Sequence, residues 1–512
     1  MKTIKILIPL FFLILSSYSC NDDYLDQEFY GEKKDENFWK SKTDIEQAIN
    51  GAVKYLDVSY GYYSLHFLLM EDATTDYFIG GASNAGQYHN FSEWRTSYPT
   101  TFSWAIWSPM WQSIYYSNLV LERLDRIPNL TETERKRYEG QARFFRALNY
   151  YVAQNNFGGV PIVTSADDSR KEILKSSREE VRKLVEADLI AAAALLPSRA
   201  DVKTEGQLSR PSKQAALGLL ARLYLNWNPE ADGTGALTDR WKKVSDACDG
   251  VINDPSGLGL EAPYSRIFAL DNENNKEIVY GIEHSNASNQ TGVFLLNTFF
   301  YTPSFPNDPT KDIEVPTASL IGYGGDWKVT RALYDSFDNL DKRKEQLYIT
   351  YKTKSGNPTR PIPFPFPASA LVKKYPLDPN NLRNSTGGND QPIIRYADII
   401  LMKAEAQNHL GNLGDAIALV NQIRTRAGLG DLLSPHTNSD DNLNTYIYHE
   451  RRREFFCEGL GRTDMIRFGT FLPWIATKPN TDGGNSKYLL FPFDGLSIDK
   501  NRALKQNPGY LN

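Results

Sequence analysis

Apolar residues at helical spacing, between signals that start and stop helices, are the feature that most constrains the fold of this chain. Thr131-Glu132-Thr133-Glu134 has the form of a capping box, in which each end of the motif satisfies a backbone N–H of the other. It predicts a helix that runs toward Asn155 and stops at Gly158-Gly159 and Pro161. Similar signals predict helices over 178–196 (capped by Ser176), 213–227 (Ser212), 239–253 (after Thr238), 392–410, 415–427 and 441–458.

Small residues on the predicted helices indicate how these helices pack. They allow the close approach seen when antiparallel helix pairs stack into a solenoid, although no strict 34-residue repeat is present. We therefore predict a mostly α fold of tetratricopeptide-like helix pairs, an α-superhelix. Two long stretches, 60–103 and 255–390, lack helical periodicity and are predicted as loop-rich insertions; loops of this length are usually functional or disordered, and their aromatic content argues against disorder. The small residues are Ala191 to Ala194, Ala215, Ala216, Gly218, Ala221, Ala404 and Ala406.

Charge, cysteine and histidine contents argue against several classes of protein. Lys+Arg 57 against Asp+Glu 62 gives a net charge of −5, so a general nucleic-acid binder is not expected. Three cysteines exclude a disulfide-stapled scaffold. Six histidines without an HExxH or CxxC motif give no basis for a metal site, and no cofactor is expected. Cys248 and Cys457 lie in predicted helices, where a buried thiol is the commoner state and a disulfide is the alternative.

The first residues have the form of a secretory signal. Lys2 and Lys5 precede a short apolar run that is too short to span a bilayer. We expect residues 1–19 to be a signal peptide and Cys20 to be the lipidated first residue of a lipoprotein; ordinary cleavage near Ser19 is the alternative. The acidic Asn21-Asp22-Asp23 is similar to the surface-export signal of Bacteroidetes lipoproteins, or is a solvated linker.

Aromatic residues are concentrated between positions 60 and 116 and fall into two groups. Trp104, Trp107 and Trp111 share one face of a predicted helix and are expected to pack in the core. Trp94 lies in a polar loop, where an exposed indole is expected, and Trp327 follows a glycine-rich segment. Exposed rings flanked by planar polar groups suit sugars, whose C–H faces stack on the ring. The candidate ligand-binding residues are Trp94, Tyr323, Trp327, Asp76 and Arg95.

Each of these loops has a simpler interpretation, in which its tryptophan only pins the loop to the core. An enzyme is a second alternative, because Glu71-Asp72 or Asp76 could serve as the carboxylate pair of a glycosidase. The sequence has no nucleophile elbow, P-loop or metal signature to support catalysis, and we predict no catalytic residue. A protein-interaction scaffold built on helical repeats is the third alternative.

Several motifs, in order along most of the chain, resemble those of the SusD/RagB family, the surface glycan-binding lipoproteins of Bacteroidetes. The matching segments are 140–147, 156–161, 394–406, 416–428, 450–459 and 462–469, with Asn507-Pro508-Gly509-Tyr510 near the end. Arg451 to Arg453 stand among Glu450, Glu454 and Glu458, which favours internal ion pairing over phosphate binding. These motifs are therefore interpreted as structural, and the ligand site is expected in the loops.

The resemblance implies more than the residues alone. It implies one SusD-like domain over 20–512, with an N-terminal part (20–255) and a C-terminal part (256–512). It also implies an outer-membrane location, a glycan ligand and a partner, the SusC-type TonB-dependent transporter, to which the ligand is delivered. Some relatives handle peptides or other nutrients, so the nature of the ligand stays open.

Overall fold

A computed structural model describes most of the helical part of the chain. The described residues are 38–56, 63, 67–80, 92–94, 99–205, 209–227, 237–273, 275–284, 327–351, 360–361, 369–372, 374–376 and 388–510. Cys20, Arg95 and Tyr323 lie outside these ranges. For 99–105 and for Trp327 only the backbone is described.

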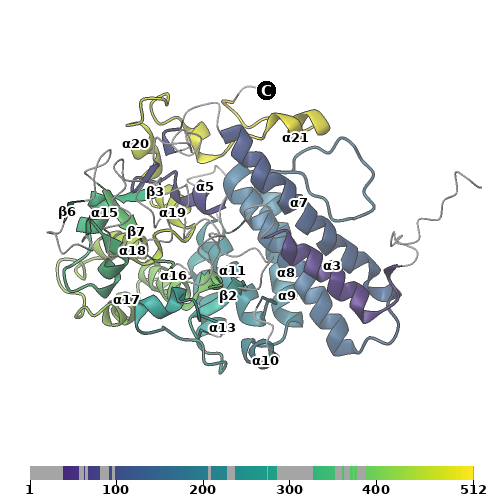
Figure 1. Cartoon of the computed structure of the whole chain (residues 1–512), viewed down its shortest axis with the longest axis horizontal. Coiled ribbons are helices and arrows are strands. Elements are labelled where there is room, and N and C mark those ends of the chain that lie inside the picture. The colour runs from purple at the N-terminus through teal and green to yellow at the C-terminus, as the bar shows by residue number, and fades with distance from the viewer. Residues whose placement is uncertain are drawn as a thin grey trace, which may run out of the picture.

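Long helices, each packed against its neighbours, dominate the structure. The chain of contacts runs from α3 to α7, α8, α9, α11, α13 and α16, and α16 contacts both α17 and α18. In Figure 1 the helices α3, α7, α8 and α9 lie side by side at one end of the molecule, and α15 to α18 lie at the other. The prediction of a mostly α fold built from stacked helix pairs is confirmed. The helices are α3 (Lys42–Lys54), α7 (Pro99–Arg123), α8 (Glu132–Phe157), α9 (Arg178–Leu195), α11 (Lys213–Leu225), α13 (Arg240–Ile252), α16 (Tyr396–His409), α17 (Leu413–Arg426) and α18 (Asp440–Phe455).

Helix starts agree with the capping signals, with small shifts. The Thr131 hydroxyl accepts a hydrogen bond from the Glu134 N–H at 3.2 Å, and the Glu134 carboxylate accepts one from the Thr131 N–H at 3.0 Å. Ser177, not Ser176, caps α9, because its hydroxyl is the one that reaches the N–H of Glu180. Asp239 is the cap of α13 rather than its first residue, and its backbone is left-handed (φ 56°).

The segment before α16 was expected to be helical and is a strand. β8 (Gln391–Arg395) pairs antiparallel with β2 (Ile278–Ile282), and all five residues of each strand are buried. The β-branched pair Ile393 and Ile394 suits a strand that is covered on both faces. A Cβ on Gly218 of α11 would lie 3.1 Å from Ile394, so the small residue lets this helix approach the strand.

A second, four-stranded sheet lies beside the C-terminal helices. Its order is β1-β3-β7-β4, with antiparallel neighbours throughout. The strands are β1 (Phe78–Gly80), β3 (Trp327–Thr330), β7 (Ser369–Val372) and β4 (Leu347–Tyr348), and a further pair joins β5 (Thr350–Tyr351) to β6 (Arg360–Pro361). Shorter helices are α5 (Leu68–Asp72), α10 (Arg199–Thr204), α15 (Arg331–Asp335), α19 (Gly461–Arg467), α20 (Phe471–Ile475) and α21 (Gly495–Lys500).

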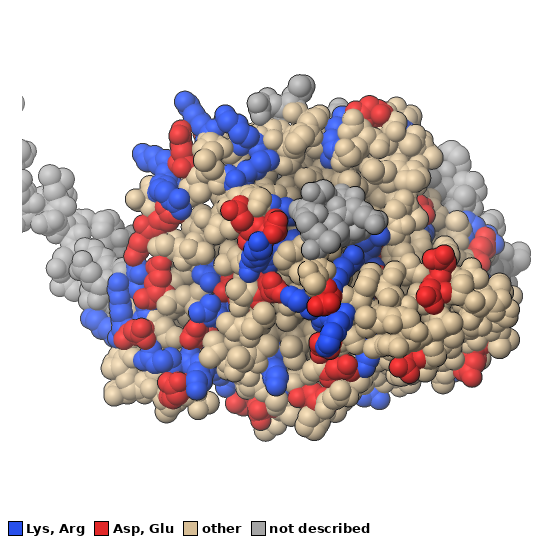
Figure 2. Space-filling model, turned by 180° about the vertical axis from the view of Figure 1, so that it is seen from behind, with Lys and Arg blue, Asp and Glu red and all other residues tan. Residues whose placement is uncertain are grey.

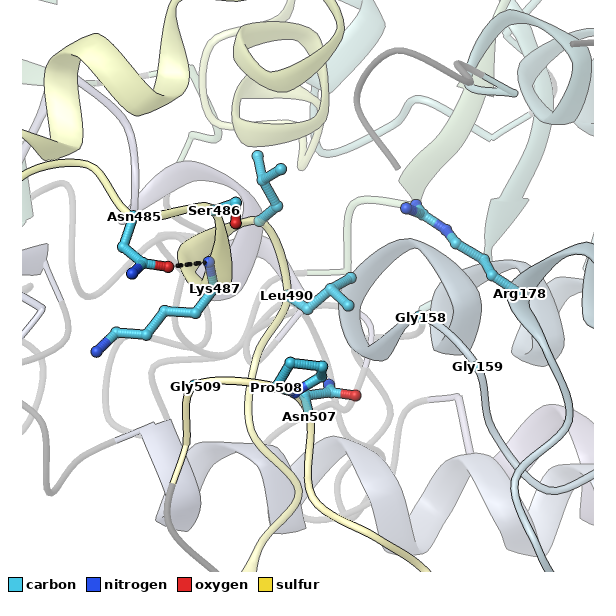
Figure 3. Close-up of a pocket in the computed structure, with 11 residues that line it drawn as sticks. Gly158, Gly159, Arg178, Asn485, Ser486, Lys487, Leu490, Asn507, Pro508 and Gly509 are labelled. Carbon is cyan, nitrogen blue, oxygen red and sulfur yellow. Dashed lines mark hydrogen bonds between the residues drawn. The ribbon is translucent and has the colours of Figure 1, made fainter. Parts of the chain in front are cut away.

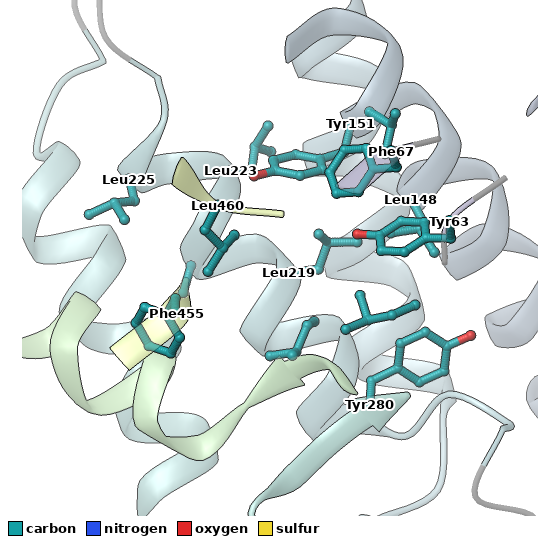
Figure 4. Close-up of a cluster of buried hydrophobic side chains, with 14 of the residues drawn as sticks. Tyr63, Phe67, Leu148, Tyr151, Leu219, Leu223, Leu225, Tyr280, Phe455 and Leu460 are labelled. Carbon is teal, nitrogen blue, oxygen red and sulfur yellow. The ribbon is translucent and has the colours of Figure 1, made fainter. Parts of the chain in front are cut away.

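The hydrophobic core runs between the helices and the β2–β8 pair. Figure 4 shows Leu148 of α8, Leu219 of α11 and Tyr280 of β2 converging with Tyr63. The prediction that the tryptophans of α7 pack in the core is confirmed for Trp107, which is buried. Trp111 also packs against the core, but its side chain stays partly exposed.

Both described cysteines, Cys248 and Cys457, are free, buried thiols, as the commoner of the two alternatives predicted. Over the face shown in Figure 2, positive and negative side chains are interspersed. Within the described ranges, no helix combines the length and the apolarity needed to cross a membrane.

Buried ion pairs connect the C-terminal helices to one another. Asp398 of α16 is fully buried and accepts from Arg222 of α11 at 2.6 Å and from Arg451 of α18 at 2.8 Å. Arg451 in turn reaches Asp464 of α19 at 2.8 Å. All three arginines form ion pairs within the protein, as predicted, but only Arg453 pairs with a neighbouring glutamate, Glu450; Arg451 and Arg452 pair with acids from distant segments. A continuous series of buried ion pairs therefore links α11, α16, α18 and α19.

We expect Asp398→Asn to destabilise the fold by about 3–5 kcal/mol, because it leaves the buried Arg222 guanidinium without a carboxylate. Urea denaturation measures the change. Asp246→Asn, which breaks the exposed i,i+4 pair with Lys242, is the matched control and should leave the urea midpoint unchanged. Equal midpoints for the two variants would contradict the role assigned to Asp398.

The buried pairs also predict how stability depends on pH. Burial by itself raises the pKa of Asp398, but Arg222 and Arg451 outweigh it and bring that pKa from 3.8 to about 2. The same balance, with Arg343 and Arg453, lowers the pKa of Glu450 from 4.5 to about 2. A carboxylate whose pKa is lower in the folded state stabilises the fold above its unfolded pKa, and this stabilisation is lost as the pH falls through the folded pKa.

We therefore expect the free energy of unfolding to fall between pH 4.5 and about 2, by on the order of 2 kcal/mol for Asp398 alone. Urea titrations at a series of pH values measure it, and the Asp398→Asn variant should show a shallower decline. A variant whose free energy falls as steeply as that of the parent protein would argue against this assignment.

Candidate functional site

The pairing of β1 with β3 joins the two segments that were predicted to carry the ligand. Gly80 is opposite Trp327 and Phe78 is opposite Val329 in the antiparallel register. The chain therefore leaves β1 at the same end of the sheet at which it enters β3. The segments 81–91 and 285–326 are attached at neighbouring points, although 193 residues separate them in sequence.

Trp327 is the first residue of β3, directly at this end of the sheet. Tyr323 and Arg95 lie outside the described residues and remain predictions. The end of the sheet formed by Gly80 and Trp327, called the β1–β3 end below, is the candidate ligand site.

Trp94 does not lie at a surface, and its predicted exposure is wrong. Its indole is buried, with 3% exposure, and stacks on Phe491 at 5.4 Å between ring centroids with planes 6° apart. Tyr488 and Phe471 close two further sides edge-on, at 5.4 and 5.9 Å. The sequence around Trp94 is polar, but its ring partners come from a segment almost 400 residues later. The simpler interpretation, a tryptophan that pins its loop to the core, is correct for this residue.

Trp94 also has a strained backbone conformation, which the packing of its ring must offset. Its φ is +52°, a left-handed conformation that bulky residues rarely adopt. The neighbouring Glu93 pairs with Lys478 at 3.0 Å, and its carbonyl accepts from Asn480. The packing of the ring and these polar contacts together offset the backbone strain. No signal in the local sequence distinguishes these partners from other polar and aromatic residues.

Asp76 lies at the other end of β1. Its carboxylate forms a two-point ion pair with the guanidinium of Arg452 (2.8 and 3.0 Å), and the side chain remains about one-third exposed. The carbonyl of the next residue, Tyr77, accepts from the N–H of Thr330 at the far end of β3. Asp76 precedes β1, and the two steps from Phe78 to Gly80 alone cover roughly 7 Å at about 3.3 Å per strand residue. The structure therefore does not bring Asp76 beside Trp327.

The other acidic residues near this segment serve the fold. Glu71 and Asp72 are buried. Glu71 accepts from the backbone and hydroxyl of Thr463, and Asp72 from Tyr77 and from the N–H groups of Gly459 and Gly461. Burial raises the pKa of Asp72 to about 7, against the lowering effect of these hydrogen bonds. Both carboxylates bind the start of α19, and neither faces a space that a substrate could occupy.

A pocket of about 480 Å³ lies where the C-terminal segment crosses the end of α8. In Figure 3, Leu490 and Asn507 lie at its centre, Arg178 borders it on one side, and the ammonium group of Lys487 extends away on the other. Asn507 donates to the carbonyls of Phe157 and Phe491 and accepts from Lys175. The described residues that line this pocket carry no aromatic ring. It is a structural joint, and it lacks the stacking surface expected of a sugar site.

Clusters of three or more His, Cys, Asp or Glu side chains that could hold a metal ion are absent from the part of the chain that the structure describes.

Sequence comparisons relate this chain to known proteins. The profile described as "Starch-binding associating with outer membrane" matches residues 23–225, and the profile described as "SusD family" matches residues 316–510. The starch-binding protein SusD of Bacteroides thetaiotaomicron is 26% identical over 76% of this chain and 75% of its own length. SusD-like protein P38 of Formosa agariphila is 25% identical over 98% of this chain and 99% of its own length.

Solved structures show the same fold. NanU of B. fragilis has a TM-score of 0.75 and 21% identity, covering 95% of this chain and 100% of that one. A laminarin-binding SusD-like protein has a TM-score of 0.73 and 22% identity, covering 92% of this chain and 100% of that one. At these identities the similarity extends to the fold and not to the ligand.

Trp94→Ala is expected to lower the free energy of unfolding by about 3–5 kcal/mol, because it empties a site enclosed by three aromatic rings. Urea denaturation measures the loss. Trp474→Ala removes a partly exposed indole that also borders Phe471 and should cost clearly less. If Trp94→Ala is as stable as Trp474→Ala, the packing described for Trp94 is incorrect.

Proposed function

Because the chain belongs to the SusD/RagB family, we propose that it captures an oligo- or polysaccharide at the cell surface and delivers it, uncleaved, to a SusC-like TonB-dependent outer-membrane transporter. Proteins of this family are associated with the outer membrane. Lipidation of Cys20 supplies the anchor in this proposal, and a mature chain from residue 20 forms one SusD-like domain.

The observation that carries the proposal is the register of β1 and β3. It attaches the two predicted ligand segments side by side and places Trp327 at the point of attachment. In this proposal Trp327 and Tyr323 stack on the C–H faces of the sugars, while Arg95 and other polar groups bond the hydroxyls. Two relatives support a glucan ligand by their descriptions, one as starch-binding and one as laminarin-binding.

The burial and ion pairing of the candidate catalytic carboxylates support binding without catalysis. A glycosidase needs two carboxyl groups on opposite sides of a sugar. Glu71 and Asp72 are instead buried against the start of α19, and Asp76 is held by Arg452. Asp76, which is about one-third exposed and paired with Arg452, keeps a place in the proposal as an acceptor of sugar hydroxyls away from the stacking ring.

We expect the full-length protein to retard in gels that contain starch or laminarin, and Trp327→Ala to weaken this binding about tenfold, the loss typical of a central aromatic anchor. Tyr323→Ala should weaken it as well. Trp241→Ala, which removes a partly exposed indole stacked on His409 of α16, is the matched control. A reducing-end assay on the same samples should detect no cleavage. Retention unchanged in the Trp327→Ala variant would place the glycan elsewhere, and released reducing ends would establish an enzyme.

A further inference from the structure

A second pocket, lined by tryptophan, contains none of the residues assigned to the ligand so far. Its volume is about 260 Å³. Three parts of the chain enclose it: one face of α7 with Trp107 and Trp111, the connection between α8 and α9 with Ile173, and the C-terminal segment with Leu496 and Lys500 of α21. In Figure 1, α21 lies beside the N-terminal half of α7.

The aromatic wall of this pocket is rigid. The Trp111 ring meets Trp107 edge-on at 5.3 Å and Tyr150 edge-on at 5.8 Å. Trp107 is itself buried against Phe157 and Phe493. Trp111 is therefore held on its core side and remains partly exposed on the other, so a ligand that contacts it meets a surface already in place.

The opposite wall is fastened by hydrogen bonds of its own. The Asn501 amide accepts from the N–H of Ile173 at 2.9 Å and donates to the Ile173 carbonyl at 2.8 Å. Ser497 donates to the cap residue Asp494. Asn501 thereby holds the segment after α21 to the α8–α9 connection, and Ser497 closes the first turn of α21.

Three other polar side chains at the pocket have no partner among the described residues. Ser108 and Gln112 lie four positions apart on α7, which places them on one face with Trp111 beside them. Lys500 comes from the end of α21 on the other side. The pocket thus combines a rigid ring with a hydroxyl, an amide and an ammonium group that are open to hydrogen bonding. Its described lining includes no acidic side chain.

From this arrangement we propose that the pocket between α7, the α8–α9 connection and α21 binds one pyranose unit of a glycan, as a second contact separate from the β1–β3 end. The C–H face of the sugar stacks on Trp111, and its hydroxyls bond to Ser108, Gln112 and Lys500. This inference rests on the proposed glycan-binding function. A second contact on the same chain would raise the avidity for a long polysaccharide without a change at the first site.

A docked apolar side chain is the competing occupant. Leu496 and Leu174 near the pocket are exposed, at 58% and 72%, and such residues suit a protein partner. An apolar occupant, however, would cover Ser108, Gln112 and Lys500 without bonding to them, and burying unpaired polar groups is unfavourable. A hydroxyl-rich ligand satisfies both the ring and the polar groups, and we therefore favour the sugar.

The test monitors the Trp111 side chain by fluorine NMR in the full-length protein. The nine tryptophans are labelled with 5-fluorotryptophan, and the fluorine signal of Trp111 is assigned from the Trp111→Phe variant. Methyl α- and methyl β-D-glucopyranoside are titrated as the probes. We expect the Trp111 signal to shift to saturation with at least one of them. The double variant Gln112→Ala/Lys500→Ala should weaken this response about tenfold, and Trp241→Ala should leave it unchanged.

The outcomes separate this inference from the proposed function. Retention by starch or laminarin with no movement of the Trp111 signal overturns the second site and leaves the first intact. Loss of all polysaccharide retention together with an unchanged Trp111 signal overturns both the proposed function and the second site. A silent Trp111, combined with loss of transporter co-purification in Trp111→Ala, identifies the pocket as a protein contact and also overturns the inference.

Discussion

The pairing of buried charges is the constraint on which the C-terminal half of this structure depends. Arg395 is almost fully buried and contacts Glu277, just before β2, and Glu454 and Glu458, at the end of α18 and directly after it. A charge removed from water is tolerated only when its partners are in place, so each helix that carries one must sit in a single position. The arginine-rich motifs therefore specify packing, and they leave little freedom for ligand chemistry within the helical body.

This rigidity explains where binding can occur. The helices present fixed surfaces, and the predicted ligand segments are attached where β1 and β3 meet. The end of α8 is also held rigidly, because the Asn507 side chain donates to the backbone carbonyls of Phe157 and Phe491. Sites at such joints are preorganised because the walls are held by interactions that do not involve the ligand.

Local rules predicted the elements whose causes are local. The Thr131–Glu134 capping box begins α8, and Ser212 caps α11, since each depends on residues within one turn. The same rules failed at 391–395, where pairing with β2 overrode an apolar pattern that reads equally well as a helix. They failed again at Trp94, because polar neighbours indicated exposure while the aromatic partners that bury the ring lie at Phe471, Tyr488 and Phe491.

The pattern of residues along the chain was enough to predict the helical class, the positions of most helices, the Arg453–Glu450 pair and the resemblance to the SusD/RagB family. Each of these depends on spacing along a helix or on the order of motifs, which a sequence displays directly. Only the tertiary structure decided that the Trp94 ring is buried, that Asp76 and Trp327 lie at different ends of one strand pair, and that Trp111 borders a pocket. Exposure of a ring is set by residues hundreds of positions away, and the spacing of nearby residues carries no record of them.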